Sequence, residues 1–125
     1  LKGFTSDDAQ TMYESGITAS FDYLGASGAS AYYAQDIATV GWAASSNKLE
    51  AIIVQKWLGV MGINALQSWF DFNRTGYPSD VPMSLLSTKP NRPVRLSYPS
   101  SELTANSNNL PTQQDVFSSK IFWAN

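Results

Sequence analysis

The stretch Trp69-Phe-Asp-Phe-Asn-Arg-Thr-Gly-Tyr-Pro78 decides the fold of this chain, because it closes a helical pattern and then forbids its continuation. Trp69 and Phe70 end an apolar pattern with helical spacing. Gly76 and Pro78 follow, and these two residue types commonly stop helices. The stretch therefore predicts a mainly α-helical region before it and a different structure after it.

Upstream, we expect residues 6–75 to be helical, starting with a helix that Gly25 ends. Ser6 is the expected N-cap, and Asp7 and Asp8 lie in the first turn, where the helix dipole favours acids. A buried stripe with i, i+3, i+4 spacing is expected to contain Ala9, Met12, Tyr13, Gly16, Ile17, Ser20, Phe21 and Leu24.

Residues 25–47 are small and polar with a few aromatics, and they predict a loop, a short helical piece and another loop. A second strong helix begins at Asn47, where Glu50 completes the pattern of a capping box. A further helix is expected from about residue 63 to 74. Residues 47–74 therefore predict an α-hairpin or a strongly bent helix.

The inner faces of these helices carry two tryptophans and two glycines. Trp57 and Trp69 fall on apolar helical stripes and are predicted to lie in the core. Gly59 and Gly62 are expected to mark either a close approach of helices or a break.

Residues 76–125 are rich in proline, which removes backbone donors and restricts the preceding residue, so we predict a loop-rich wrap. Within it, residues 94–98 suit a short extended segment, and Pro99 opens a short helix with Glu102 capping backbone donors. Residues 106–109 form a turn cluster. The aromatics expected to fasten the wrap are Tyr77, Tyr98, Phe117, Phe122 and Trp123.

The composition excludes several functions. The formal net charge is −2, which argues against nucleic acid as a partner, because phosphate binding needs an excess of lysine and arginine. The chain has no cysteine and no histidine. These residues alone therefore cannot build a disulfide, a thiolate nucleophile, a Cys/His zinc site or a histidine-dependent serine triad. We expect no metal and no cofactor.

Asp71 and Glu102 are the candidate carboxylates for catalysis, because a glycosidase needs an acid and a base at a fixed separation. Local roles explain both residues better. Asp71 and Arg74 are three residues apart, so on a helix they are neighbours and are expected to form an ion pair. We therefore predict that the chain is not an enzyme.

Aromatic rings are common sugar platforms, since the apolar face of a pyranose stacks on a flat ring. Most aromatics here lie on helical stripes, but Tyr32, Tyr33 and Trp42 lie among polar residues outside the strong helices. These three are the candidate ligand-binding residues.

Several blocks together resemble the C-terminal part of the SusD/RagB family, in its SusD-like branch of outer-membrane nutrient-binding lipoproteins. Members are several times longer, so residues 1–125 resemble the C-terminal portion of a SusD-like domain, and Trp57, Trp69, Asp71, Arg74, Gly76, Pro78 and Glu102 are its structural motif residues. The resembling blocks are Tyr13–Phe21, Ile53–Trp57, Trp69–Pro78, Arg95–Glu102 with Asn106 and Asn109, and Lys120–Trp123.

The resemblance implies a helical fold related to tetratricopeptide arrays, with helix pairs. It also implies non-catalytic binding of an oligosaccharide or another nutrient at the surface of the outer membrane, for delivery to a SusC-like TonB-dependent transporter. No apolar run here is long enough to span a membrane, and residues 1–6 lack a signal-peptide pattern, so membrane attachment is expected only through an N-terminal lipid anchor outside this chain. The alternative is a helical protein-interaction scaffold without its own ligand.

Overall fold

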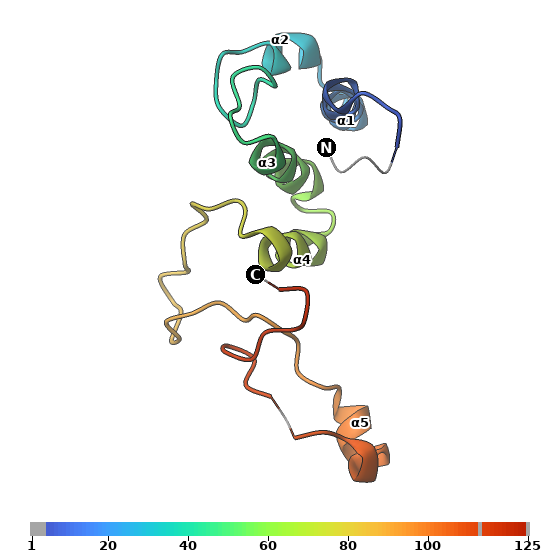
Figure 1. The fold of residues 1–125 in the computed structure, drawn as a ribbon, viewed down its shortest axis with the longest axis vertical. Helices are drawn as coiled ribbons and strands as arrows, with labels where there is room; N and C mark the ends of the chain where they lie inside the picture. Colours follow the sequence, from blue (N-terminus) through green and yellow to red (C-terminus); the bar gives the residue numbers. More distant parts are fainter. Residues whose placement is uncertain (1–4, 113, 125) are drawn as a thin grey trace. The chain divides into compact units, whose positions relative to one another are not determined.

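The structure is a computed structural model that describes residues 5–112 and 114–124, so the first residues of the N-terminal stretch lie outside the description. Among the described residues there are helices and irregular segments but no strand, which confirms the mainly α-helical prediction (Figure 1). The chain forms two compact units that divide between Asp71 and Phe72. The helices are α1 (Ala9–Tyr23), α2 (Ala29–Tyr33), α3 (Lys48–Val60), α4 (Ala65–Thr75), α5 (Ser100–Ala105) and a short 3-10 helix (Ser107–Asn109).

Helix α1 begins after Asp8, not at the predicted N-cap Ser6. The Asp8 carboxylate accepts hydrogen bonds from the backbone N–H of Thr11 at 2.8 Å and from its hydroxyl at 2.9 Å. These bonds lower the pKa of Asp8. They also satisfy a backbone N–H of the first helical turn, which Ser6 cannot cap because it lies too early in the chain. At the other end Gly25 has φ of 65° and stops the helix, as predicted.

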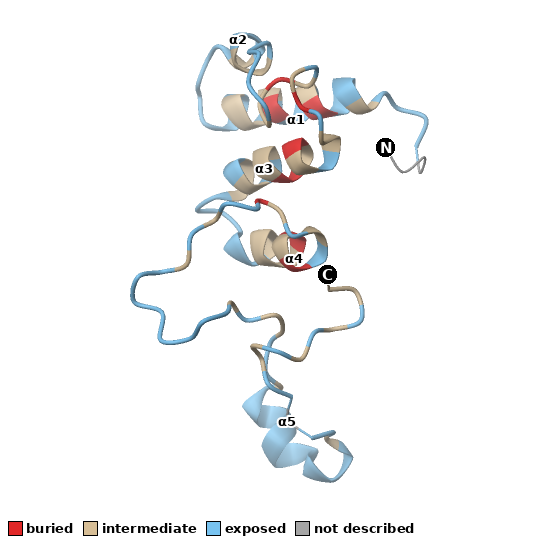
Figure 2. Cartoon of the chain, turned by 60° about the vertical axis from the view of Figure 1, so that its left-hand side comes forward, coloured by how far each residue is buried: buried red, intermediate tan, exposed pale blue. Residues whose placement is uncertain are grey.

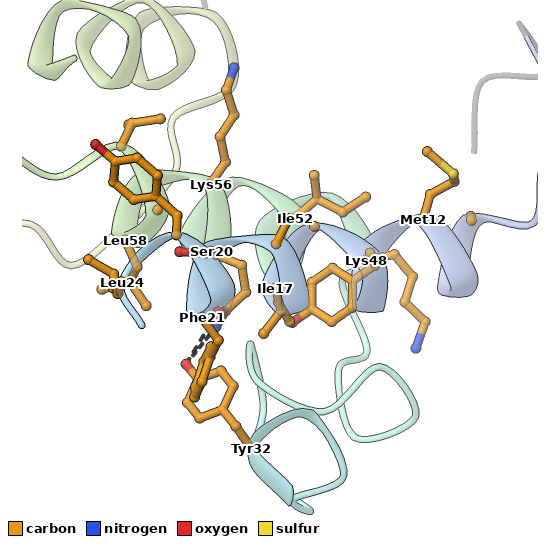
Figure 3. Close-up of a pocket in the computed structure, with 18 of the residues that line it drawn as sticks. Met12, Ile17, Ser20, Phe21, Leu24, Tyr32, Lys48, Ile52, Lys56 and Leu58 are labelled. Atoms are coloured by element: carbon orange, nitrogen blue, oxygen red, sulfur yellow. Dashed lines mark hydrogen bonds between the residues drawn. The ribbon is translucent and has the colours of Figure 1, made fainter. Parts of the chain in front are cut away.

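Helices α1 and α3 lie side by side in the first unit, and Figure 3 shows them running in the same direction. Gly59 near the end of α3 faces Ser20 near the end of α1, since a Cβ built on Gly59 would be 3.6 Å from the Ser20 hydroxyl oxygen. Gly62, with φ of 77°, lies just after α3. Both predicted roles of these glycines, close approach and break, are confirmed.

The core of this unit lies where α1 meets α3, and Figure 2 shows buried residues on both helices and on the loop before α3. Tyr13, Ile17 and Ala51 form its buried centre. Partly buried side chains packed around that centre are Phe21, Tyr32, Tyr33, Trp42 and Ile52.

The loop between α2 and α3 is fastened through the backbone of one residue, Thr39. Its N–H donates to the Ser45 hydroxyl at 3.0 Å. Its carbonyl accepts from the Gln55 side-chain amide of α3 at 2.8 Å and lies 3.2 Å from the Tyr13 hydroxyl of α1, whose shorter hydrogen bond goes to the neighbouring Val40 carbonyl at 2.8 Å. Thr39 has φ of 68°, which is unfavourable for a β-branched residue, so these bonds hold a strained loop between two helices.

Helices α3 and α4 are separate and joined by a short turn, so residues 47–74 form two helices and not one bent helix, and the α-hairpin packing stays a prediction. Asn47 is the N-cap of α3, as predicted, and its side chain accepts from the Glu50 backbone N–H at 3.2 Å. Asp71 is buried and pairs with Lys56 of α3 at 2.6 Å, a partner that was not predicted. The pairing of Asp71 with Arg74 stays a prediction.

Trp57 and Trp69 are partly buried and lie outside the buried centre, so the structure does not show them as fully buried core residues. Trp57 follows the buried Ile53 by one helical turn on α3, but it stays partly exposed near the end of that helix. The Trp69 ring instead contacts Phe70, with centroids 5.2 Å apart. Helical spacing identified the apolar stripe but not the face that the core uses.

In the second unit, α5 starts after Pro99 as predicted, but Glu102 does not cap backbone donors. Its carboxylate accepts from the Asn106 side-chain amide at 3.0 Å. The reason is local: a glutamate at the third helical position reaches back to the N–H of the N-cap residue, and Pro99 has none. The 3-10 helix after Asn106 confirms the predicted turn at residues 106–109.

The rest of this unit is irregular, and residues 94–98 form no strand. Val94 donates its backbone N–H to Val116 at 2.8 Å, which ties the segment to the C-terminal residues. Phe122 is 99% exposed, so its predicted fastening role is wrong. Phe122 lies in a turn near the end of the described residues, and its neighbours Ile121 and Trp123 are partly buried.

Gly41 offers a direct test of the loop before α3. A Cβ at this position would lie 2.0 Å from the backbone oxygen of Gln35, a distance that forces the backbone to move. Gly41→Ala should destabilise the protein by about 2 kcal/mol or more, because backbone cannot yield as a flexible side chain does. Gly16→Ala is the control, since a Cβ there meets nothing within 4 Å, and chemical denaturation measures both. Equal stability of the two variants would contradict the packing described.

Tyr13 makes stability depend on alkaline pH. Burial, with a smaller contribution from Tyr32, raises the pKa of Tyr13 to about 12 from 10.0. The fold favours the neutral phenol, so its contribution is complete below about pH 10 and is lost as the pH rises through about 12. Thermal unfolding followed across this range should show a smaller fall of Tm in Tyr13→Phe than in wild type. Parallel curves would show that Tyr13 titrates as it does in the unfolded chain.

Candidate functional site

A small polar depression lies between α1 and α2, and we call it the α1–α2 concavity. Its volume is about 320 Å³. Its walls combine a tyrosine ring, hydroxyls and carboxylates, a mixture suited to a polar ligand with one apolar face. The residues that line it are Thr11, Glu14, Ser15, Thr18, Ala19, Asp22 and Tyr33.

Some polar side chains of this concavity already make hydrogen bonds within the protein, and others do not. Glu14 accepts from the Gln10 side-chain amide at 2.7 Å, and the Thr18 hydroxyl donates to the Glu14 backbone oxygen at 2.9 Å. Within the part of the chain that the structure describes, the side chains of Ser15, Asp22 and Tyr33 make no hydrogen bond. These three groups are therefore available to a ligand.

A larger and mostly apolar depression, the α1–α3 groove, lies between those two helices in the first unit (Figure 3). Its volume is about 1340 Å³. Met12 of α1, Leu24 just after α1 and Leu58 of α3 line it and are 57%, 71% and 42% exposed. Such a surface suits apolar contacts more than the hydroxyls of a sugar.

The structure does not bring the three predicted ligand-binding residues into one site. Tyr32 lines the α1–α3 groove, where its ring contacts Phe21 at 5.5 Å and its hydroxyl bonds with Gln55. Tyr33 lines the α1–α2 concavity. Their neighbouring positions on α2 direct them to different depressions.

Trp42 lines neither depression and packs within the first unit. Its ring lies 5.2 Å from the Tyr13 ring, and the Lys48 ammonium lies over it at 5.0 Å from the centroid. Lys48 also donates to the Trp42 carbonyl. These contacts give Trp42 a structural role beside Tyr13 and at the start of α3.

Asp22, Ser15 and Glu14 were missed as candidates for the concavity. A signal existed in the sequence: Thr11, Ser15, Thr18 and Asp22 repeat at helical spacing and form a polar stripe on α1. A polar stripe normally faces water, and only the position of Tyr33 beside it makes a depression. That position depends on α2, which the stripe itself does not predict.

The carboxylates weighed for catalysis have structural surroundings. Asp71 is buried in its ion pair with Lys56, and Glu102 binds Asn106. Among the described residues, no three acidic side chains gather into a group that could hold a metal ion. Across residues 5–112 and 114–124, no helix has both the length and the hydropathy needed to cross a membrane.

Comparison with known proteins gives one match. The family model SusD-like_2, described as "Starch-binding associating with outer membrane", matches residues 1–99, which include all of the first unit. No curated protein and no solved structure matches the chain. The helical structure agrees with this family, and both confirm the resemblance seen in the sequence motifs. The chain belongs to the SusD-like family of starch-binding proteins that associate with the outer membrane.

Proposed function

We propose that this chain belongs to a surface-exposed outer-membrane protein that binds oligosaccharides reversibly and delivers them to a SusC-like TonB-dependent transporter. The observation that carries the proposal is the family match over residues 1–99. The family's description names starch binding and the outer membrane, and the transporter and surface exposure are the further steps proposed here.

The chemistry of the chain supports binding without bond cleavage. Histidine and cysteine are absent, and the two carboxylates that a glycosidase would need are engaged in other contacts. Selectivity would then come from stacking and hydrogen bonds at a preformed surface. Attachment to the membrane would use an N-terminal lipid anchor, as the resemblance implies.

Glycan binding is tested by isothermal titration of the full chain with maltohexaose, cellohexaose and xylohexaose. We expect saturable binding of maltohexaose, the starch-type sugar, with at least tenfold weaker binding of the other two, because the family is described as starch-binding. Tighter binding of cellohexaose or xylohexaose would support the glycan-binding function but identify a different sugar as the ligand. No saturable binding of any of them would favour the protein-interaction scaffold.

Delivery to a transporter is tested separately in the source cells. A tagged form of the native protein is cross-linked in intact outer membranes, and the captured proteins are identified by mass spectrometry. We expect a TonB-dependent transporter as a principal product, and a tagged unrelated lipoprotein serves as the control. Capture without any TonB-dependent transporter would contradict the delivery step and leave glycan binding unaffected.

A further inference from the structure

We propose that the α1–α2 concavity is a subsite for one neutral sugar ring, which Tyr33, Asp22 and Ser15 hold. This inference rests on the proposed glycan-binding function and adds to it a location and a substrate class. It starts from a depression lined by a tyrosine, in which the side chains of Ser15, Asp22 and Tyr33 make no hydrogen bond to any described residue.

The size of the concavity fits one ring and not a chain of sugars. Its volume of about 320 Å³ lies at the lower end of the range for small-molecule sites, which is roughly 300–1,000 Å³. A longer oligosaccharide would place one unit here and extend its other units along the exposed surface. The concavity therefore acts as a subsite and contributes part of the affinity.

The available groups match the pattern of a pyranose. The Asp22 carboxylate presents only acceptors, so it can receive hydrogen bonds from two neighbouring sugar hydroxyls. The Ser15 and Tyr33 hydroxyls both donate and accept, and both are unpaired in the described part of the chain. The Tyr33 ring adds an apolar surface for the C–H face of the sugar.

Charge restricts the ligand further. Among the described residues, Glu14 and Asp22 are the charged side chains that line the concavity, and no lysine or arginine lines it. A uronate or a sulfated sugar would place its anion beside two carboxylates without a compensating cation, which is unfavourable. Neutral hexoses satisfy the same hydrogen bonds without this repulsion.

The competing location is the α1–α3 groove, which Tyr32 lines. There the Tyr32 hydroxyl is already bonded to Gln55, and the Gln55 amide also donates to the Thr39 carbonyl. Polar groups that are already hydrogen-bonded within the protein are poor partners for sugar hydroxyls, because binding a ligand would break the existing hydrogen bonds. The unpaired groups therefore favour the concavity.

The test titrates the full chain with maltotriose and with tri-galacturonate, an anionic trisaccharide. Wild type should bind maltotriose at least tenfold more tightly than tri-galacturonate. Tyr33→Ala and Asp22→Ala should each weaken maltotriose binding about fivefold or more, the loss expected for one stacked ring or one charged hydrogen-bond partner.

Two matched substitutions serve as controls. Tyr23→Ala removes an exposed tyrosine that lines the α1–α3 groove, and Asp36→Ala removes an exposed acid that lines neither depression. Both should keep wild-type affinity. Because Tyr33 packs partly against the core, its variant is checked for an unchanged thermal transition, while Asp22 is exposed and tests the site without that complication.

The outcomes separate the two proposals. Maltotriose binding that survives both Tyr33→Ala and Asp22→Ala overturns the subsite and leaves the glycan-binding function standing. Loss of maltotriose binding in Tyr23→Ala alone also overturns the subsite, because it would show that the sugar binds in the α1–α3 groove. Tighter binding of tri-galacturonate than of maltotriose overturns the neutral-sugar assignment. A wild-type chain that binds no glycan at all removes the proposed function itself, and the subsite with it.

Discussion

The first unit depends on the peptide group of Thr39. Its carbonyl joins Tyr13 of α1 to Gln55 of α3, and its N–H is held by Ser45. A positive φ at a β-branched residue costs about 1–2 kcal/mol, whereas each hydrogen bond contributes about 1 kcal/mol net. The bonds to Gln55 and Ser45 offset that cost, and the Tyr13 hydroxyl, which is shared between the Thr39 and Val40 carbonyls, adds to them. Its position between two helices fixes where the loop and α2 lie.

The same network places the candidate site. Gln55 bonds with the Tyr32 hydroxyl as well as with Thr39, and this turns Tyr32 toward α3. The next residue on a helix lies about 100° further around its axis, so Tyr33 is directed elsewhere and reaches the polar stripe of α1. The concavity is thus a consequence of how the neighbouring tyrosine is anchored.

Local interactions made much of the fold predictable. The stops at Gly25 and Gly76 and the N-cap at Asn47 depend on nearby residues only, and each was predicted from the sequence. Burial was harder, as Trp57 and Phe122 show, because it depends on which face meets another part of the chain. Periodicity identifies the apolar stripe of a helix, but it does not identify the part of the chain against which that stripe packs.

The candidate site was predictable only in part, for a related reason. Tyr32, Tyr33 and Trp42 look equivalent in the sequence, since each is an aromatic among small or polar residues. They differ in whether their contacts are already made within the fold. Tyr32 bonds with Gln55, and Trp42 packs on Tyr13 under the Lys48 ammonium, so both stabilise the unit.

Tyr33 shows what this difference means for recognition. Tyr33 packs at the edge of the core, yet its hydroxyl has no partner in the described part of the chain, and the residue lines the same concavity as Ser15 and Asp22. A group whose hydrogen bonds are satisfied internally loses energy when it turns to a ligand, whereas an unpaired surface group only exchanges water for the ligand. In a family that binds glycans, the unpaired tyrosine is therefore the one that we propose to meet the sugar.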